Sequence, residues 1–355
     1  MPKRLENDHC GSLISLENGT IFLGQGSYKR APKLDHLDPR KPAFYLPDFF
    51  LRTASPWIQY DSWQELSIKE FQVYLEGDQV ESIEPLDWHI DHEDLFQEAF
   101  AELQQAFREG RLEKGVPYAF ASTSDKMSWK RLRYALKHAV SYIQSYPGYL
   151  YGHWEGQSGF LGVTPEILFR HHQEQPSLLW TMALAGTRKE NDCPEEFEKN
   201  EKEHREHQLV IEGISKDLQR MGKVIPGKTS VLNLPTLKHL LTPIEVHLDQ
   251  PFHFESAVVS MHPTPALGAF PRQEGWRWLE SVQKKLDRQH YGAPFGFCFG
   301  SRGLSFCVVA IRQVQWSASG MRIPAGCGVI KSSILQKEWD EVQLKIRAIR
   351  NLLAL

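Results

Sequence analysis

Hydrophobic residues recur at helical spacing in three long stretches of the chain. In Asp91–Arg108 and in Trp129–Ser145, apolar side chains fall three or four positions apart, and Pro147-Gly148 follows the second stretch. In Leu335–Leu353, an apolar stripe with the same spacing leaves the charged residues on the other face. This period is typical of amphipathic helices that pack one face against a core. We therefore predict a helix in each stretch.

Shorter apolar runs with strand character occupy most of the remaining chain. Ser12–Leu16 and Thr20–Leu23 flank Glu17-Asn18-Gly19, and Asn-Gly tolerates the positive φ of a tight hairpin turn. Strand runs joined by hairpins, with helices inserted between them, predict an α+β fold with a large, mostly antiparallel sheet. Further strands are predicted at Gly148–Trp154, Gly159–Val163, Ser177–Ala185, Leu304–Trp316 and Met321–Ile330.

A charged helix is predicted at Glu195–Met221, directly after a proline that suits a first helical turn. Within it, Glu203 and Glu206 lie three positions apart and share one face. The C-terminal helix carries a second pair, Glu338 and Glu341. Two acidic helices that face one pocket would hold Mg²⁺, which takes oxygen ligands. A solvated charged surface explains each run alone equally well, so spacing leaves both interpretations open.

Composition narrows the class of protein. The chain has 355 residues, of which 41% are hydrophobic and 24% charged, and its 19 Phe, 11 Tyr and 10 Trp exclude a mainly disordered chain. A formal net charge of −3 argues against a broad surface for nucleic acid or anionic membrane. The expected partner is a small molecule. At about 150 residues per domain, the length fits two domains or one large one.

Cysteine usage and the N-terminus favour a cytoplasmic protein. The five cysteines form no C-x-x-C pair, and their odd number fits reduced thiols. The first residues lack the apolar segment of a signal peptide, and no apolar run reaches the ~20 residues of a membrane helix. The chain also lacks the P-loop, H-E-x-x-H and G-x-S-x-G motifs.

An ordered series of segments resembles the chorismate-utilising enzymes, and within them the isochorismate synthases most closely. Gly162–Phe169 resembles the G-x-[ST]-P-E-x-L segment, Leu184–Arg188 resembles the L-A-G-T-x-R turn, and Glu201–Val210 resembles the metal-binding E-K-x-x-x-E-H helix. Each motif alone is weak, but their order is specific. The others are Leu234–Leu240, His262–Gly268, Tyr291–Gly296, Ala310–Arg312, Ala325–Ile330 and Glu338–Glu341.

The resemblance covers about residues 100–355 and implies one large structural domain with its active site in a central cleft. Residues 91–355 would form the chorismate-binding catalytic region. Residues 1–90 match only loosely, and we expect them to form the N-terminal part of the same fold. No site residue is assigned to them.

The resemblance implies that water is added at C2 of chorismate while the C4 hydroxyl leaves. It places the general base at Lys114, in a segment resembling G-x-L-x-K-x-V, and the general acid at Glu166. A lysine acts as a base only if its pKa is lowered, and a carboxyl group acts as an acid near neutral pH only if burial raises its pKa. From the residues alone, a surface lysine and a structural turn remain the alternatives.

The resemblance further implies a Mg²⁺ cofactor and a set of substrate contacts. Glu206 and Glu341 would be direct ligands, with Glu203 and Glu338 beside them; carboxylates favour Mg²⁺ over zinc. The guanidinium of Arg312 would hold the enolpyruvyl carboxylate. The implied substrate-binding residues are Gly186, Thr187, His239, Ala266, Tyr291, Arg312, Gly326, Gly328 and Lys345.

Two positions separate the reactions within the family. Leu184 and Ala266 stand where anthranilate and aminodeoxychorismate synthases, which use ammonia, have other residues, and salicylate synthases carry threonine at the position of Ala266. They predict water as the nucleophile and isochorismate as the product. Chorismate is the expected substrate; no amidotransferase subunit is expected, and a monomer would suffice. Menaquinone and siderophore synthesis both stay open as the pathway.

Two further observations bear on activity. Cys327 stands where the family commonly has alanine, a small change that concerns packing more than chemistry. A catalytically inactive relative would lack one of the four central residues, and all are present. Without the resemblance, a metal-binding structural protein would be a serious alternative. The four residues are Lys114, Glu166, Glu206 and Glu341.

Overall fold

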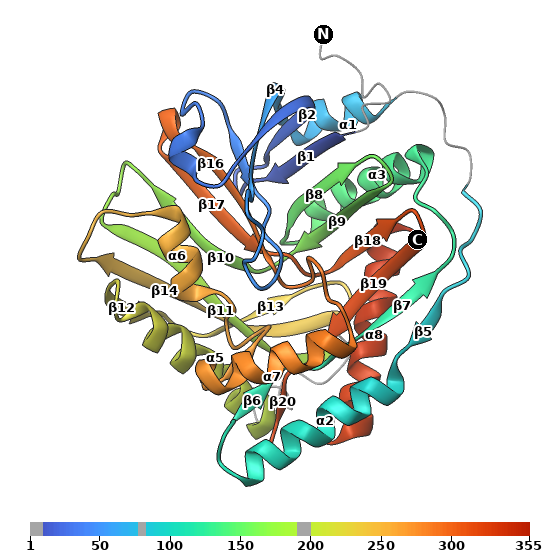
Figure 1. Ribbon diagram of the computed structural model, residues 1–355, viewed down its shortest axis with the longest axis vertical. Helices are drawn as coiled ribbons and strands as arrows, with labels where there is room; N and C mark the ends of the chain where they lie inside the picture. Colours follow the sequence, from blue (N-terminus) through green and yellow to red (C-terminus); the bar gives the residue numbers. More distant parts are fainter. Residues whose placement is uncertain (1–9, 77–82, 190–199) are drawn as a thin grey trace.

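The computed structural model describes residues 10–76, 83–189 and 200–355 (Figure 1). Two short 3-10 turns lie at Leu34–His36 and Gly300–Arg302. The helices are α1 (Ile68–Leu75), α2 (Glu93–Arg108), α3 (Trp129–Ser145), α5 (Glu201–Leu218), α6 (Phe254–Met261), α7 (Arg272–Lys285) and α8 (Leu335–Leu353).

Within the described residues, the strands form one large sheet and one small sheet. The small sheet has three strands, β6 (Lys114–Gly115) between β15 (Ala269–Phe270) and β20 (Val329–Ile330). The large sheet has 17 strands: β1 (Cys10–Ser15), β2 (Thr20–Ala31), β3 (Ala43–Tyr45), β4 (Trp57–Ser67), β5 (His89–Asp91), β7 (Tyr118–Thr123), β8 (Tyr149–Glu155), β9 (Ser158–Thr164), β10 (Ile167–His172), β11 (Leu178–Lys189), β12 (Gly222–Pro226), β13 (Ser230–Asn233), β14 (Leu237–Leu248), β16 (Pro294–Phe299), β17 (Leu304–Val309), β18 (Gln313–Ser317) and β19 (Gly320–Gly326).

Neighbouring strands pair antiparallel, which confirms the predicted α+β fold with a large antiparallel sheet. The predicted hairpin is formed by β1 and β2, with Leu13 opposite Leu23. β1 also pairs with β8, and β3 pairs with β16, so strands from the first third of the chain share a sheet with strands from its end. In Figure 1, α2, α5 and α7 gather around the small sheet at one end of the molecule.

The helix predictions held best where the apolar period was long. α3 and α8 have the predicted bounds, and α2 begins at Glu93, two residues after its predicted start. The predicted helix over 195–221 was too long at its C-terminal end, where α5 stops at Leu218 and Gln219 caps it. Residues 195–199 of that prediction lie outside the described residues.

Two predicted long strands were wrong, because each breaks where the chain passes the pocket. The run over 304–316 divides into β17 and β18, and between them Arg312 has the left-handed φ of +53°. The run over 321–330 divides into β19, in the large sheet, and β20, in the small one. Apolar residues lie on both sides of each break, so the apolar pattern alone does not show where the chain leaves the strand.

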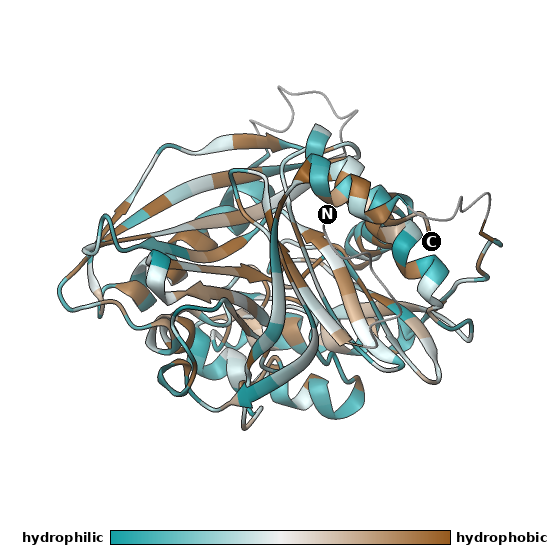
Figure 2. Cartoon of the chain, turned by 90° about the horizontal axis from the view of Figure 1, so that it is seen from above, coloured by the Kyte–Doolittle hydropathy of each residue, from teal (hydrophilic) through white to brown (hydrophobic). Residues whose placement is uncertain are grey.

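Buried apolar faces hold the helices against the sheets. α8 buries Trp339, Val342 and Ile346, and the ring of Trp339 lies 5.1 Å from that of Phe96 on α2. Figure 2 shows the same alternation, with hydrophobic and hydrophilic bands along each helix. Burial of this kind stabilises by roughly 25 cal/mol per Å² of apolar surface. In the described part of the chain, no helix is both long enough and apolar enough to cross a membrane.

Candidate active site

A cavity of about 230 Å³ lies between β11, β14, the segment around Arg312 and the inner face of α8. Five of the predicted site residues do not line this cavity: Lys114, Gly186, Glu203, Glu338 and Glu341. The predicted residues that line it are Glu166, Thr187, Glu206, His239, Ala266, Tyr291, Arg312, Gly326, Gly328 and Lys345.

Lys114 is fully buried beneath one end of this cavity. Its Nζ donates a hydrogen bond to the carbonyl of Pro265 at 2.8 Å and lies 3.5 Å from Oε1 of Glu206. Burial lowers the pKa of Lys114, while Glu206 opposes that shift. Gly328 makes the arrangement possible, because a Cβ there would overlap the carboxylate of Glu206 and lie 2.9 Å from Nζ of Lys114.

Four glutamates from two helices lie beside this cavity: Glu206 lines it, and the other three line a neighbouring cavity. Glu203 and Glu206 come from α5, and Glu338 and Glu341 come from α8. Nζ of Lys202 lies 3.4 Å from Glu203, 3.4 Å from Glu206 and 3.1 Å from Glu338. The fold therefore brings the two acidic pairs together. The spacing of the residues in the sequence could not show this.

Burial and neighbouring lysines act in opposite directions on the pKa values of Glu203, Glu206 and Glu338. Burial raises the pKa of Glu203 to about 7, and Glu206 adds to that rise. Burial alone would also raise the pKa of Glu206, but Lys114, Lys202 and Lys345 outweigh it and lower the pKa. Burial raises the pKa of Glu338. The same carboxylates outweigh burial and raise the pKa of Lys202.

Lys345 closes the site from α8. Its Nζ lies 2.7 Å from Oε1 of Glu341 and donates to the carbonyl of Gly326 at 2.9 Å. Burial alone would lower the pKa of Lys345, and the neighbouring Glu341 carboxylate raises it instead. Lys345 therefore stays a cation beside the cavity.

The chemistry of this donor set fits a hard divalent cation. All four side chains offer carboxylate oxygens, and Oε2 of Glu338 is buried with no hydrogen-bond partner among the described residues. In the described part of the chain, no group of three or more His, Cys, Asp or Glu side chains is arranged so that it could already hold a metal ion. Lysine ammonium groups lie among the carboxylates instead.

Glu166 lies elsewhere on the cavity wall and has a different environment. It follows β9, is 2% exposed, and its backbone N–H donates to Oγ1 of Thr164 at 3.2 Å. Burial raises the pKa of Glu166 to about 8, against the opposing influence of Lys114. A carboxyl group in this state keeps its proton near neutral pH and can donate it.

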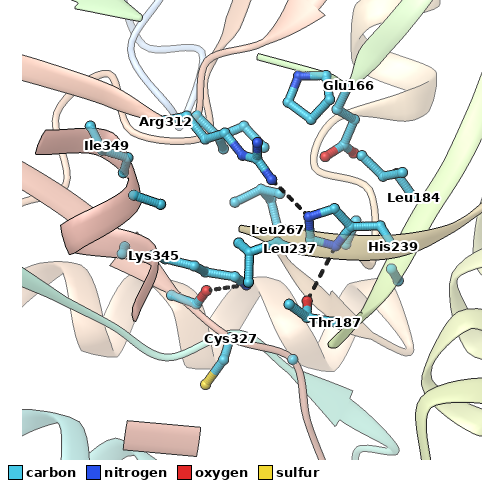
Figure 3. A pocket seen from close by; sticks show the side chains of 18 of the residues that line it. Glu166, Leu184, Thr187, Leu237, His239, Leu267, Arg312, Cys327, Lys345 and Ile349 are labelled. Carbon is cyan, nitrogen blue, oxygen red and sulfur yellow. Dashed lines mark hydrogen bonds between the residues drawn. The ribbon is translucent and has the colours of Figure 1, made fainter. Parts of the chain in front are cut away.

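Arg312 and His239 form a hydrogen-bonded pair across the cavity (Figure 3). Nη2 of Arg312 lies 2.7 Å from Nε2 of His239. Because a guanidinium only donates, Nε2 must accept, and the imidazole proton belongs on Nδ1. Nδ1 lies 3.3 Å from the carbonyl of Gly186 and 3.3 Å from Oγ1 of Thr187. Burial, with Arg312 nearby, lowers the pKa of His239 well below its usual range, so the ring is neutral.

Gly186 is required by the backbone at this point. The register between β11 and β14 shifts between Ala185 and Thr187, and Gly186 has φ of +74°. Its missing side chain also leaves room for Glu203, whose carbonyl would lie 3.1 Å from a Cβ. The turn delivers the N–H of Thr187 to Oε2 of Glu203 at 2.7 Å.

Sequence reasoning missed several residues of the site. Tyr142 lines the cavity from α3, and Asn351 and Leu352 line it from the last turn of α8; the apolar period of those helices gave no sign of this. Lys202 lies inside a recognised motif but was given no role. The sequence feature that could have identified Lys202 is a lysine in the first turn of a helix, where the positive end of the helix dipole disfavours a cation.

The large antiparallel sheet and the cavity lined by Glu166, His239 and Arg312 belong to an enzyme of the chorismate-utilising class, as a match to that family shows. Residues 62–354 match the family described as chorismate binding enzyme, and the chain belongs to that family.

Two curated relatives are isochorismate synthases by name. The salicylate biosynthesis isochorismate synthase of Pseudomonas aeruginosa is 32% identical over 208 residues, which are 56% of this chain and 43% of that protein. Isochorismate synthase EntC of Escherichia coli is 28% identical over 204 residues, 55% of this chain and 51% of that protein. The match therefore spans about half the length of these relatives.

Solved structures confirm the fold over nearly the whole chain. MenF, the menaquinone-specific isochorismate synthase of Escherichia coli, has a TM-score of 0.78 and 19% identity, covering 98% of this chain and 90% of that one. Anthranilate synthase component I of Streptococcus pneumoniae has a TM-score of 0.71 and 17% identity, covering 98% and 92%. The fold is therefore shared by proteins named as an isochorismate synthase and as an anthranilate synthase component.

Proposed function

We propose that this protein is an isochorismate synthase, which converts chorismate into isochorismate by adding water at C2 and releasing the C4 hydroxyl. One observation carries the proposal. A buried glutamic acid with a pKa of about 8 lines the cavity, and a buried lysine with a lowered pKa lies 3.5 Å from Glu206, another residue of the cavity wall. Each is shifted toward the protonation state that a base or an acid needs near neutral pH.

In this reaction Lys114 takes a proton from the water that attacks C2. Glu166 gives a proton to the C4 oxygen, which leaves as water while the ring double bonds shift. The gain at Lys114 and the loss at Glu166 balance, and the two groups are reset through solvent. Water enters and water leaves, so the net change is an isomerisation.

Substrate carboxylates are held by charged groups on the cavity wall. Arg312, held in place by His239, presents a planar guanidinium that suits the enolpyruvyl carboxylate. Glu206 and Glu341 would hold Mg²⁺, with Glu203 and Glu338 beside them. The bound ion would neutralise the ring carboxylate and fix its orientation. The all-carboxylate donor set and the unpartnered oxygen of Glu338 support this role.

Water, and not ammonia, is the proposed nucleophile. Leu184 and Ala266 both line the cavity, where their side chains can shape the space beside the substrate. An anthranilate synthase or a salicylate synthase is the alternative function, and the fold does not separate them. We further propose a cytoplasmic protein that acts without an amidotransferase subunit.

Product analysis tests the proposal. Purified protein is incubated with chorismate and Mg²⁺, with and without ammonium, and the products are resolved by chromatography. Isochorismate should be the main product in both mixtures. Anthranilate with ammonium, or salicylate in either mixture, as the main product would overturn it. The same incubation with Lys216→Met, an exposed change on α5, serves as the control.

A further inference from the structure

Lys202 lies at the meeting point of the two acidic helices. Its side chain comes from α5, and its ammonium group contacts Glu203 and Glu206 on that helix and Glu338 on α8. Oε2 of Glu338, buried and without a hydrogen-bond partner among the described residues, belongs to the same cluster. Lys202 therefore joins α5 to α8 through their carboxylates.

The position of Lys202 is locally unfavourable for a cation. Asn200 caps α5 by accepting from the backbone N–H of Glu203 at 3.1 Å, which places Lys202 in the first turn. The positive end of the helix dipole favours acids there and disfavours a lysine. The gain that keeps an ammonium group at this place must come from the carboxylates that surround it.

Lys202 also differs from the other two lysines at the site. Lys114 donates to the carbonyl of Pro265, and Lys345 donates to the carbonyl of Gly326, so backbone acceptors anchor both. The contacts of the Lys202 ammonium within the described residues are with carboxylates. If a competing cation takes those oxygens, no other partner among the described residues retains the ammonium group of Lys202.

Room for such a movement lies beside the cluster. A second cavity of about 310 Å³ is lined by Lys202 together with Asn200, Ser333 and Glu338. A lysine stem has four rotatable bonds, and its compact ammonium group is readily hydrated. The side chain can therefore turn away from the carboxylates without a change in the backbone.

We propose that Lys202 is the built-in counterion of the metal site: its ammonium group holds the carboxylates of α5 and α8 together when Mg²⁺ is absent, and Mg²⁺ displaces it on binding. This inference rests on the proposed Mg²⁺ site. Ammonium and Mg²⁺ need the same carboxylate oxygens, so they exclude each other. Without either cation, several carboxylates would be buried close together, which is costly.

Calorimetric titration of substrate-free protein with MgCl₂, at constant ionic strength, tests the exchange. Lys202→Met keeps the length of the side chain and removes the competing charge, so it should bind Mg²⁺ about tenfold more tightly than the natural protein. Lys216→Met, an exposed change near the other end of α5, should bind like the natural protein. Lys202→Gln provides a second neutral variant with the same expected direction.

Thermal unfolding gives a second readout. Without Mg²⁺, Lys202→Met should melt at a lower temperature than the natural protein, and saturating Mg²⁺ should remove most of that difference. A lysine with a purely structural role would leave the same deficit at both Mg²⁺ concentrations. If the variant folds only with Mg²⁺ present, that dependence is the extreme form of the expected result.

The outcomes separate the two proposals. Equal or weaker Mg²⁺ binding by Lys202→Met and Lys202→Gln, while the natural protein binds the ion, would overturn the exchange and leave the metal site standing. Failure of the natural protein to bind Mg²⁺ in the titration would overturn the metal site, and the exchange with it.

Discussion

Two regions of one cavity treat the same residue type in opposite ways. Glu166 follows a strand in a largely apolar wall, and burial raises its pKa to about 8. Glu206, on α5, is also buried, but the three lysines around it lower its pKa. One carboxyl group keeps its proton and the other stays an anion. The comparison teaches that neighbouring cations, more than burial itself, separate the ionisation of the proposed acid from that of the proposed metal ligand.

The largest expected effect comes from Lys114, which belongs to both regions. Lys114→Ala should lower kcat by about 10²–10⁴-fold, because it removes the proposed base. Chromatographic measurement of isochorismate formation gives the rate. Lys216→Met should keep the natural rate. A Lys114→Ala enzyme with more than a tenth of the natural rate would contradict the assignment.

Glu166→Gln should lower kcat by about 10²–10³-fold and change the pH profile. The pKa of Glu166 is raised to about 8, so the acid form is present below that pH and activity falls as pH rises through it. The residual activity of the variant should lack this alkaline limb. Glu174→Gln, at an exposed glutamate, should keep the limb. The pH profile of kcat/KM, which reports pKa values of the free enzyme, checks both variants.

Lys114 should determine the acidic limb of the same pH profile. Its pKa is lowered, and the amine must lose its proton to act as a base, so activity should rise with pH as that proton is lost. Glu166→Gln should leave this acidic limb in place. A variant that lost both limbs together would show that the two groups do not titrate in separate roles.

Glu341→Gln should act on the other region alone. Loss of one carboxylate ligand should weaken Mg²⁺ binding by about 10–100-fold, and added Mg²⁺ should restore much of kcat. The alkaline limb set by Glu166 should remain, and Glu166→Gln should bind Mg²⁺ normally. Asp340→Asn, at the exposed neighbour on α8, is the control. Titration of activity and calorimetry with MgCl₂ separate these results.

The smallest expected effect concerns Arg312, which stands between the two regions. Arg312→Lys keeps the charge but loses the planar fork, so KM for chorismate should rise about tenfold with a smaller change in kcat. Arg347→Lys, at an exposed site on α8, should leave both parameters unchanged. Steady-state kinetics with chorismate measure kcat and KM for both variants. A fall in kcat with unchanged KM would assign Arg312 to the chemical step instead of binding.

Periodicity predicted the four longest helices of the described chain, missed the shorter α1, α6 and α7, and did not reveal the breaks in the strands. α3 and α8 have the predicted bounds because each presents a long, regular apolar stripe to the core. The break at Arg312 lies between two apolar stretches, and the one after Gly326 carries the chain from one sheet to the other. Apolar character persists on both sides of each break, so only the tertiary arrangement reveals them.

The sequence named most of the candidate site but not its electrostatics. Ordered motifs supplied residues such as Glu166 and Arg312, and the fold brings them to one cavity. The pKa of Glu166 depends on what covers it, and the place of Lys202 depends on a helix more than a hundred residues away. Neither can be read from local pattern, because both arise from contacts between distant segments.

The most direct test of the account follows the oxygen of the nucleophile. The natural protein is incubated with chorismate and Mg²⁺ in H₂¹⁸O, and the isochorismate formed is examined by mass spectrometry with fragmentation. Water added at C2 predicts one ¹⁸O atom in the C2 hydroxyl of the product. Isochorismate without ¹⁸O would show that the hydroxyl migrates from C4 without exchange, and would contradict the acid–base mechanism proposed for Lys114 and Glu166.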